Sequence, residues 1–262
     1  LGLLYDQGKY VPRDIKKAIY YYSMASKKNN KYAQYYLGVI FCDESNALNK
    51  YKEGIFLLTE SSKKSYDPAN FVLGYLYHVG KHVNLDINKA IHYYKESSSF
   101  NNKHAKNNLA VIYLNGYKNI ISPNIPLAIE YFQEAIRKSN DLLSMYNLAH
   151  YYLYDQYDEI ILDKSIELFI KLPYKKLLFV IDLLCLALIR RYQNNFENIV
   201  KKLDQNLELI CLIQKLIKDK NLYDPFYFNR YYEKFRSLFV IYNNVYNAES
   251  YSKNNYYKGR II

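Results

Sequence analysis

Residues 69–94 read ANFVLGYLYHVGKHVNLDINKAIHYY, and this stretch decides the fold. In its first half Leu73 is followed by Gly74, and the apolar residues around them recur at the spacing of one helix face. In its second half Ala90 is followed by an isoleucine and then by a pair of tyrosines. Gly80 stands between the halves, where a helix end commonly needs a left-handed residue. The stretch therefore predicts a pair of helices joined by a loop.

The same pattern recurs along the first two thirds of the chain. A leucine followed by glycine or alanine, with spacings of 36, 36, 36 and 39 residues, stands at Leu1, Leu37, Leu73, Leu109 and Leu148. A small residue followed by isoleucine recurs at nearly the same spacing, at Ala18, Gly54, Ala90, Ala128 and Ser165. Two landmarks that share one period indicate a tandem array. Stacking is obligatory, because one helical hairpin cannot bury its own apolar face.

Polar residues mark the expected helix starts. Asp67 is predicted to cap the first helix of the third copy, with Pro68 at its first helical position. Asp14, Asp86 and Asn124 are predicted to cap second helices.

Small residues are expected where the two helices of a hairpin cross. Glycine or alanine after each leucine lets the first helix pack closely against the alanine of the second. Gly54 and Ser165 replace that alanine in the second and fifth copies, which also lack the loop glycine. We expect these two hairpins to be looser or differently angled.

The combined motif resembles the Sel-one-like repeat family, a relative of the tetratricopeptide repeat, whose period is about 34 residues. That family shows A-x-x-x-L-G-x-x-Y-x-x-G, a loop ending in V-x-x-D, and then K-A-x-x-Y-Y. This chain has the three parts at Ala69 to Gly80, Val83 to Asp86 and Lys89 to Tyr94. The resemblance implies an all-α fold, a right-handed α-solenoid (superhelix) of tandem helix-turn-helix repeats. It also implies adaptor work in multiprotein complexes, for example in signalling or protein quality control.

The array is expected to occupy residues 1–173 as five repeats, at about 1–30, 31–65, 66–102, 103–140 and 141–173. Residues 174–246 keep helical periodicity and are expected to form a degenerate repeat and a helical C-terminal cap. Residues 247–262 are predicted to be a flexible tail. Leu1 already lies inside a repeat, so we expect the sequence to be part of a longer protein.

Composition excludes several classes of protein. The aromatic fraction of 17%, including 33 tyrosines, is too high for a disordered chain, and 8 glycines with 6 prolines are too few for a collagen-like one. Three cysteines cannot make a disulfide scaffold, which favours a reducing, cytoplasmic compartment. The most apolar stretch, residues 177–189, is too short to span a bilayer and contains Asp182, so we expect a core helix there.

The positive charge leaves an alternative open. The net charge is +11, and residues 1–140 carry +8 of it, which suits acidic partners. Lysine supplies 29 of the 36 basic residues, however, whereas arginine is better suited to phosphate and base recognition. Binding of nucleic acid or of an anionic surface by the basic, tyrosine-rich repeats is therefore kept as the alternative function.

No catalytic, cofactor or metal site is predicted. His78 and His82 have the spacing of a helical zinc pair, but Gly80 falls between them, and we interpret them as loop histidines. Cys42, Cys185 and Cys211 lie on apolar helix faces and are interpreted as core residues.

Since no catalytic or metal site is predicted, a binding surface on the repeats is the remaining candidate for a functional site. By analogy with helical-hairpin solenoids, first helices line the concave face, so residues two before, two after and five after each leucine should face a groove. The predicted partner-binding groove consists of Tyr35, Val39, Phe71, Tyr75, His78, Asn107, Val111, Tyr146 and His150. The position five after the leucine also holds Cys42, Leu114 and Leu153.

An aromatic, mostly uncharged groove suits an extended peptide or a helix. The predicted function is a non-enzymatic scaffold or adaptor that binds a protein partner there. A signalling protein with an upstream kinase domain is one setting that the resemblance implies. A third hypothesis treats the array as a spacer between domains.

Overall fold

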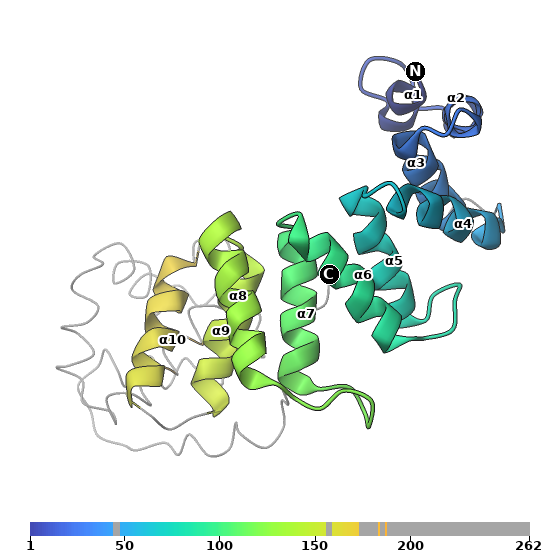
Figure 1. The fold of residues 1–262 in the computed structure, drawn as a ribbon. Coiled ribbons are helices and arrows are strands. Elements are labelled where there is room, and N and C mark those ends of the chain that lie inside the picture. Colours follow the sequence, from blue (N-terminus) through green and yellow to red (C-terminus); the bar gives the residue numbers. More distant parts are fainter. Residues whose placement is uncertain (44–47, 156–158, 173–182, 184–186, 188–262) are drawn as a thin grey trace, which may run out of the picture. The chain divides into compact units, whose positions relative to one another are not determined.

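The structure is a computed structural model that describes residues 1–43, 48–155 and 159–172, together with residues 183 and 187. These residues contain no β-strand and form ten helices (Figure 1). The helices are α1 (Gly2–Gln7), α2 (Ile15–Lys27), α3 (Lys31–Cys42), α4 (Tyr51–Ser62), α5 (Asp67–Val79), α6 (Ile87–Ser99), α7 (Lys103–Asn115), α8 (Ile125–Ser139), α9 (Leu142–Asp155) and α10 (Glu159–Lys171). The predicted all-α class is confirmed.

Helices that are consecutive in sequence pack against each other. The pairs α1–α2, α3–α4, α5–α6 and α7–α8 are hairpins, and each hairpin packs on the next through α2–α3, α4–α5 and α6–α7. The first helices α3 and α5 also touch each other. These eight helices form one compact unit, and α9 with α10 is a hairpin in a second unit that begins at Asn140. Within the first unit, the four repeats therefore form the predicted α-solenoid of tandem helix-turn-helix units.

The predicted caps of the second helices are present. The Asp14 carboxylate accepts a hydrogen bond from the Lys17 amide at 3.0 Å, and Asp86 accepts one from Lys89 at 3.0 Å. These backbone hydrogen bonds lower the pKa of both aspartates. The Asn124 side chain accepts a hydrogen bond from the Leu127 amide at 3.1 Å.

Asp67 differs from its predicted role. Tyr66 is the N-cap of α5, and Asp67 is already the first helical residue. Its carboxylate instead accepts hydrogen bonds from the Ser97 hydroxyl and from the Asn102 side chain, the latter at 3.2 Å. Asn102 caps the first helix of the next repeat, so Asp67 joins two repeats rather than capping its own helix. Gly80 does end α5 in the left-handed conformation, with φ 70°, as predicted.

The glycine after the leucine makes room for a tyrosine ring. A Cβ atom on Gly74 would lie 2.6 Å from the Tyr94 ring, and one on Gly2 would lie 2.7 Å from the Tyr22 ring. Both tyrosines stand four residues after the alanine that was expected to be the contact. The small residue therefore admits an aromatic side chain of the second helix into the core.

Of the two alternatives expected for the second hairpin, looser or differently angled, the looser one is wrong. A Cβ atom on Gly38 or on Gly54 would lie 2.9 Å from the carbonyl oxygen of the other glycine, so the backbones of α3 and α4 approach closely. In the fifth repeat, the Ser165 hydroxyl donates a hydrogen bond to the Ala149 carbonyl at 2.8 Å. Both departures from alanine are accommodated by close contact between the paired helices.

Stacked tyrosines recur where the two helices of a hairpin meet. The rings lie nearly parallel with centroids 5.8, 5.8 and 6.0 Å apart in the pairs Tyr5–Tyr21, Tyr77–Tyr93 and Tyr113–Tyr131. A lysine ammonium lies over the first ring of each pair, at 5.2, 5.1 and 5.9 Å, from Lys17, Lys89 and Lys95. These repeated contacts explain part of the tyrosine content as packing.

Several predictions fall on residues that the structure does not describe. Apart from Leu183 and Ala187, the proposed degenerate repeat and cap at 174–246 lie outside the described residues. The same holds for the tail at 247–262 and for Cys185 and Cys211.

Candidate partner-binding surface

Two adjacent first helices present part of the predicted groove. Tyr35 and Val39 lie on α3, Phe71 and Tyr75 lie on α5, and all four side chains are half-buried. The helices α3 and α5 touch, and we call these four residues the first-helix surface.

Neighbouring rings hold the first-helix surface in place. Tyr35 makes edge-to-face contacts with Tyr36 at 5.1 Å and with Tyr66 at 5.2 Å between ring centroids. Phe71 lies 6.0 Å from the rings of both Tyr94 and His104. Burial, followed by the nearby Tyr36 and Asp67, raises the pKa of Tyr35, so its phenol stays protonated and able to donate a hydrogen bond.

Other predicted groove residues lie in the core. The exposed fraction of the residue is only 6% for His78, 0% for Asn107 and 4% for Val111. The position five residues after the leucine is also buried in the second, fourth and fifth repeats, at Cys42, Leu114 and Leu153, whereas Asp6 in the first repeat is half-buried. In the second to fifth repeats this position faces the packed interior rather than a groove.

The two histidines of the zinc-like spacing do not share a site. His78 is a buried residue of α5 rather than a loop residue, its Nδ1 lies 3.4 Å from the Tyr94 hydroxyl, and burial lowers its pKa. His82 stacks on Tyr51 at 3.7 Å, and its Nε2 lies 3.0 Å from the Cys42 carbonyl oxygen. In the part of the chain that the structure describes, no group of three or more His, Cys, Asp or Glu residues could hold a metal ion.

Tyr146 and His150 belong to the second unit. Both lie on α9 and are half-buried, with ring centroids 5.8 Å apart. Tyr154 lies 4.6 Å from His150 on the same helix, and burial lowers the pKa of His150 to about 4. These residues form an aromatic group within their own unit.

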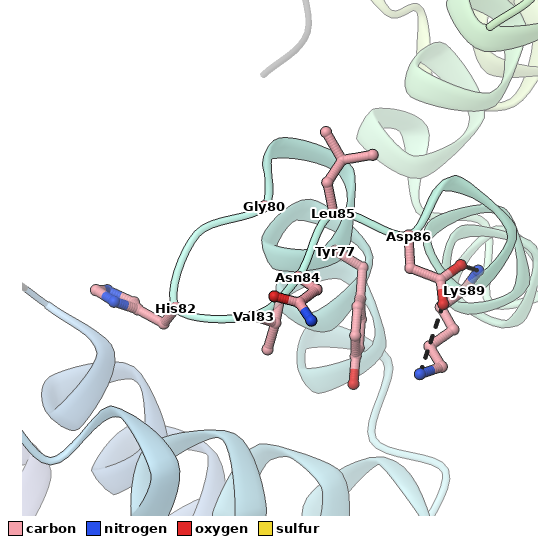
Figure 2. Close-up of a pocket in the computed structure, with 8 residues that line it drawn as sticks. All are labelled: Tyr77, Gly80, His82, Val83, Asn84, Leu85, Asp86 and Lys89. Carbon is pink, nitrogen blue, oxygen red and sulfur yellow. Dashed lines mark hydrogen bonds and ion pairs between the residues drawn. The ribbon is translucent and has the colours of Figure 1, made fainter. Parts of the chain in front are cut away.

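An open hollow of about 660 Å³ lies beside the loop that joins α5 to α6 (Figure 2). Its lining residues are Tyr77, Gly80, His82, Val83, Asn84, Leu85, Asp86 and Lys89. Figure 2 shows Asp86 beside Lys89, and their charged groups lie 3.5 Å apart. Lys89 also contacts the Tyr77 ring, so the charged groups of this hollow already interact with each other and with α5.

The turns between repeats form a feature that the sequence analysis missed. Each contains a left-handed residue, with φ 64° at Asn29, 52° at Ser65 and 65° at Asn101. Lys64 donates hydrogen bonds to the Asn29 side chain and to its carbonyl oxygen, the latter at 3.1 Å. Asp67 and Asn102 connect the second turn to the third. Three consecutive turns are therefore in direct contact.

A buried lysine joins the helices of the fourth repeat. Lys106 on α7 is 2% exposed, and its ammonium lies 2.9 Å from the Glu134 carboxylate on α8. The Asn101 side chain accepts a second hydrogen bond from Lys106 at 3.3 Å. The Lys106 hydrogen bond lowers the pKa of Glu134.

Replacing Glu134 with glutamine is expected to lower the free energy of unfolding at neutral pH by about 1–2 kcal/mol. This is less than a fully buried pair would lose, because Glu134 remains partly in water. Since the folded-state pKa of Glu134 is lowered from 4.5, its contribution is present above pH 4.5 and fades as the pH falls through the folded value. Denaturant unfolding of both proteins at neutral and acidic pH checks this, and a gap that persists in acid would contradict it.

No helix in the described part of the chain is long and apolar enough to cross a membrane. Glu44 stands in place of the loop glycine in the second repeat and lies outside the described residues.

Comparison with known proteins agrees with the repeat architecture. A model of the Sel1 repeat matches residues 1–30, 31–66, 67–99, 103–140 and 142–171. A search of the curated proteins found no match.

Among solved structures, one similar chain is a protective antigen of uropathogenic Escherichia coli strains with an SLR fold. It is 22% identical with a TM-score of 0.64, and the match covers 72% of this chain and 40% of that chain. A Sel1 repeat protein from Oxalobacter formigenes is 18% identical with a TM-score of 0.58, with 90% of this chain and 84% of that chain covered. At such identities the two structures show a shared fold. Because the family matches take in more than half of its residues, the chain belongs to the Sel1 repeat family.

Proposed function

We propose that this chain is a non-enzymatic scaffold that binds a peptide or helix of a partner protein on the first-helix surface. Sel1 repeats generally serve as scaffolds for protein–protein interaction. The proposal for this chain rests on one observation, the half-buried row of Tyr35, Val39, Phe71 and Tyr75 on two touching helices.

The chemistry of the row suits a protein segment. Tyrosine and phenylalanine rings offer a large apolar contact area at a small entropic cost, since each has only two side-chain torsions. The ring contacts of Tyr35 and Phe71 already restrict those torsions before a partner arrives. The Tyr35 phenol can also donate a hydrogen bond to a backbone carbonyl of the partner.

We expect the double variant Tyr35→Ala/Tyr75→Ala to bind partner peptides at least about tenfold more weakly, as loss of interface hot spots usually does. The probes are peptides enriched on the wild-type chain from a random phage-displayed library, and affinity is measured by fluorescence anisotropy. The matched control is Tyr10→Ala/Tyr20→Ala, which removes tyrosines that are 75% and 60% exposed outside the surface. Equal affinity for wild type and a double variant of unchanged helicity would refute the proposal.

We also propose a cellular setting for the chain. A cytoplasmic location is supported by a cysteine-poor sequence and by Cys42, which is a buried free thiol. Adaptor work in signalling, with a kinase domain in the same polypeptide, is supported by the family resemblance alone.

A further inference from the structure

We propose that the turns between the first four repeats form a basic edge that binds acidic segments of the partner protein. The basic edge is defined as residues 27–31, 63–67 and 99–103. This inference rests on the proposed function and adds the chemical class of the partner.

Hydrogen bonds between neighbouring turns make the basic edge continuous. The Lys31 ammonium donates a hydrogen bond to the Lys64 carbonyl oxygen at 3.3 Å. The Lys64 ammonium in turn donates one to the Asn29 carbonyl oxygen. Asp67 accepts a hydrogen bond from Asn102 at 3.2 Å. The three turns therefore lie side by side, and a segment that crosses one of them meets the next.

Lysine dominates the charge of this edge. Its six lysines are Lys27, Lys28, Lys31, Lys63, Lys64 and Lys103. Asp67 is its single carboxylate, and hydrogen bonds from Ser97 and Asn102 already engage it. Glu60 and Glu96 lie one turn earlier, on α4 and α6, and Glu60 pairs with Lys63 at 2.7 Å. The excess of cations favours an acidic partner and raises its rate of association.

The basic edge adjoins the first-helix surface. Tyr66 lies on the edge, and its ring centroid is 5.2 Å from that of Tyr35 and 5.1 Å from that of Tyr32. Lys31 lies over both Tyr32 and Tyr66, at 5.7 and 5.8 Å. One bound segment can thus place apolar residues on the first-helix surface and carboxylates on the basic edge.

A protein fits this edge better than a nucleic acid does. All six cations are lysines, whose ammonium groups are strongly hydrated point charges. The basic edge contains no arginine, whose guanidinium can make paired hydrogen bonds to a phosphate or to a nucleic-acid base. The apolar first-helix surface beside it has no counterpart in a phosphate backbone. We therefore commit to an acidic protein segment that also carries apolar residues.

The test uses the full chain and the same phage-displayed peptide library. Enriched sequences are expected to carry a more negative mean charge than the starting library. Lys27→Gln/Lys28→Gln/Lys63→Gln should weaken the best peptide about tenfold at low salt, and the loss should shrink as salt is added. The matched control, Lys9→Gln/Lys16→Gln/Lys52→Gln, removes the same charge from three other exposed lysines and should change affinity by less than about twofold.

Two results would overturn the inference. One is an equal effect of the two triple variants, which would mean that only the net charge matters. The other is polyuridylate RNA binding more tightly than the best peptide and losing affinity with the edge variant, which would favour the nucleic-acid function. If the lysine variant weakens binding but Tyr35→Ala/Tyr75→Ala does not, the basic edge stands and the first-helix surface fails. The reverse pattern leaves the proposed function standing without this inference.

Discussion

Replacing Tyr94 with alanine is expected to lower the free energy of unfolding by about 3–5 kcal/mol, the cost of deleting a large aromatic side chain from a packed core. Tyr94 is fully buried, and its ring fills the space that Gly74 leaves open on α5. Its hydroxyl also lies 3.4 Å from the Nδ1 atom of buried His78. The variant therefore creates a cavity and removes a polar neighbour of that imidazole.

Denaturant unfolding followed by far-UV circular dichroism checks this prediction. Tyr94→Phe keeps the ring and should lose only about 1 kcal/mol, the usual contribution of one hydrogen bond. Tyr20→Ala removes a tyrosine that is 60% exposed and should change stability by less than about 0.5 kcal/mol. A loss below about 1 kcal/mol for Tyr94→Ala would mean that the Tyr94 ring does not hold the third repeat together.

Gly54→Ala is expected to destabilise the chain by about 1–3 kcal/mol, although three other repeats have alanine at this position. In an open helix the change would add up to about 1 kcal/mol of stability, because alanine has the higher helix propensity. Here the new Cβ atom would lie 2.7 Å from the Cys42 sulfur and 2.9 Å from the Gly38 carbonyl oxygen. Relief of the second contact requires α3 and α4 to move apart.

The control for this prediction is Lys52→Ala, an exposed position on the same helix, whose stability should stay within about 0.5 kcal/mol of wild type. Thermal and denaturant unfolding of the two variants give the comparison. If Gly54→Ala stabilises the protein, the close approach of α3 and α4 at Gly38 is wrong.

The fold followed from the sequence because it depends on local patterns that repeat. Gly80 ends its helix in the left-handed conformation, and Asp14 and Asp86 cap theirs, since each signal acts through backbone groups a few residues away. The common period of the leucine and alanine landmarks then implied stacked hairpins.

The candidate surface followed only in part, because the burial of a helix face depends on its neighbours. Tyr35 and Asn107 occupy the same position in their repeats, yet the first is half-buried and the second is fully buried. The error at Gly54 has a similar origin. Whether a missing methyl group loosens a hairpin or draws its helices together depends on the facing residue, here Gly38.

The basic edge could have been recognised from the sequence. Lys27-Lys28 and Lys63-Lys64 recur with the 36-residue period of the array, at the ends of consecutive second helices. Its continuity could not, because it depends on left-handed turn residues and on hydrogen bonds between residues about 35 positions apart.

Site-specific photocrosslinking tests the proposed binding surface most directly. The photoreactive residue p-benzoylphenylalanine would replace Tyr75 on the first-helix surface in one protein and Tyr20 on α2 in another. Each protein would be irradiated with the best library-selected peptide. Our account predicts a covalent peptide adduct from position 75, suppressed by excess unlabelled peptide, and none above background from position 20. Adducts of equal yield from both positions, or an adduct from position 20 alone, would contradict it.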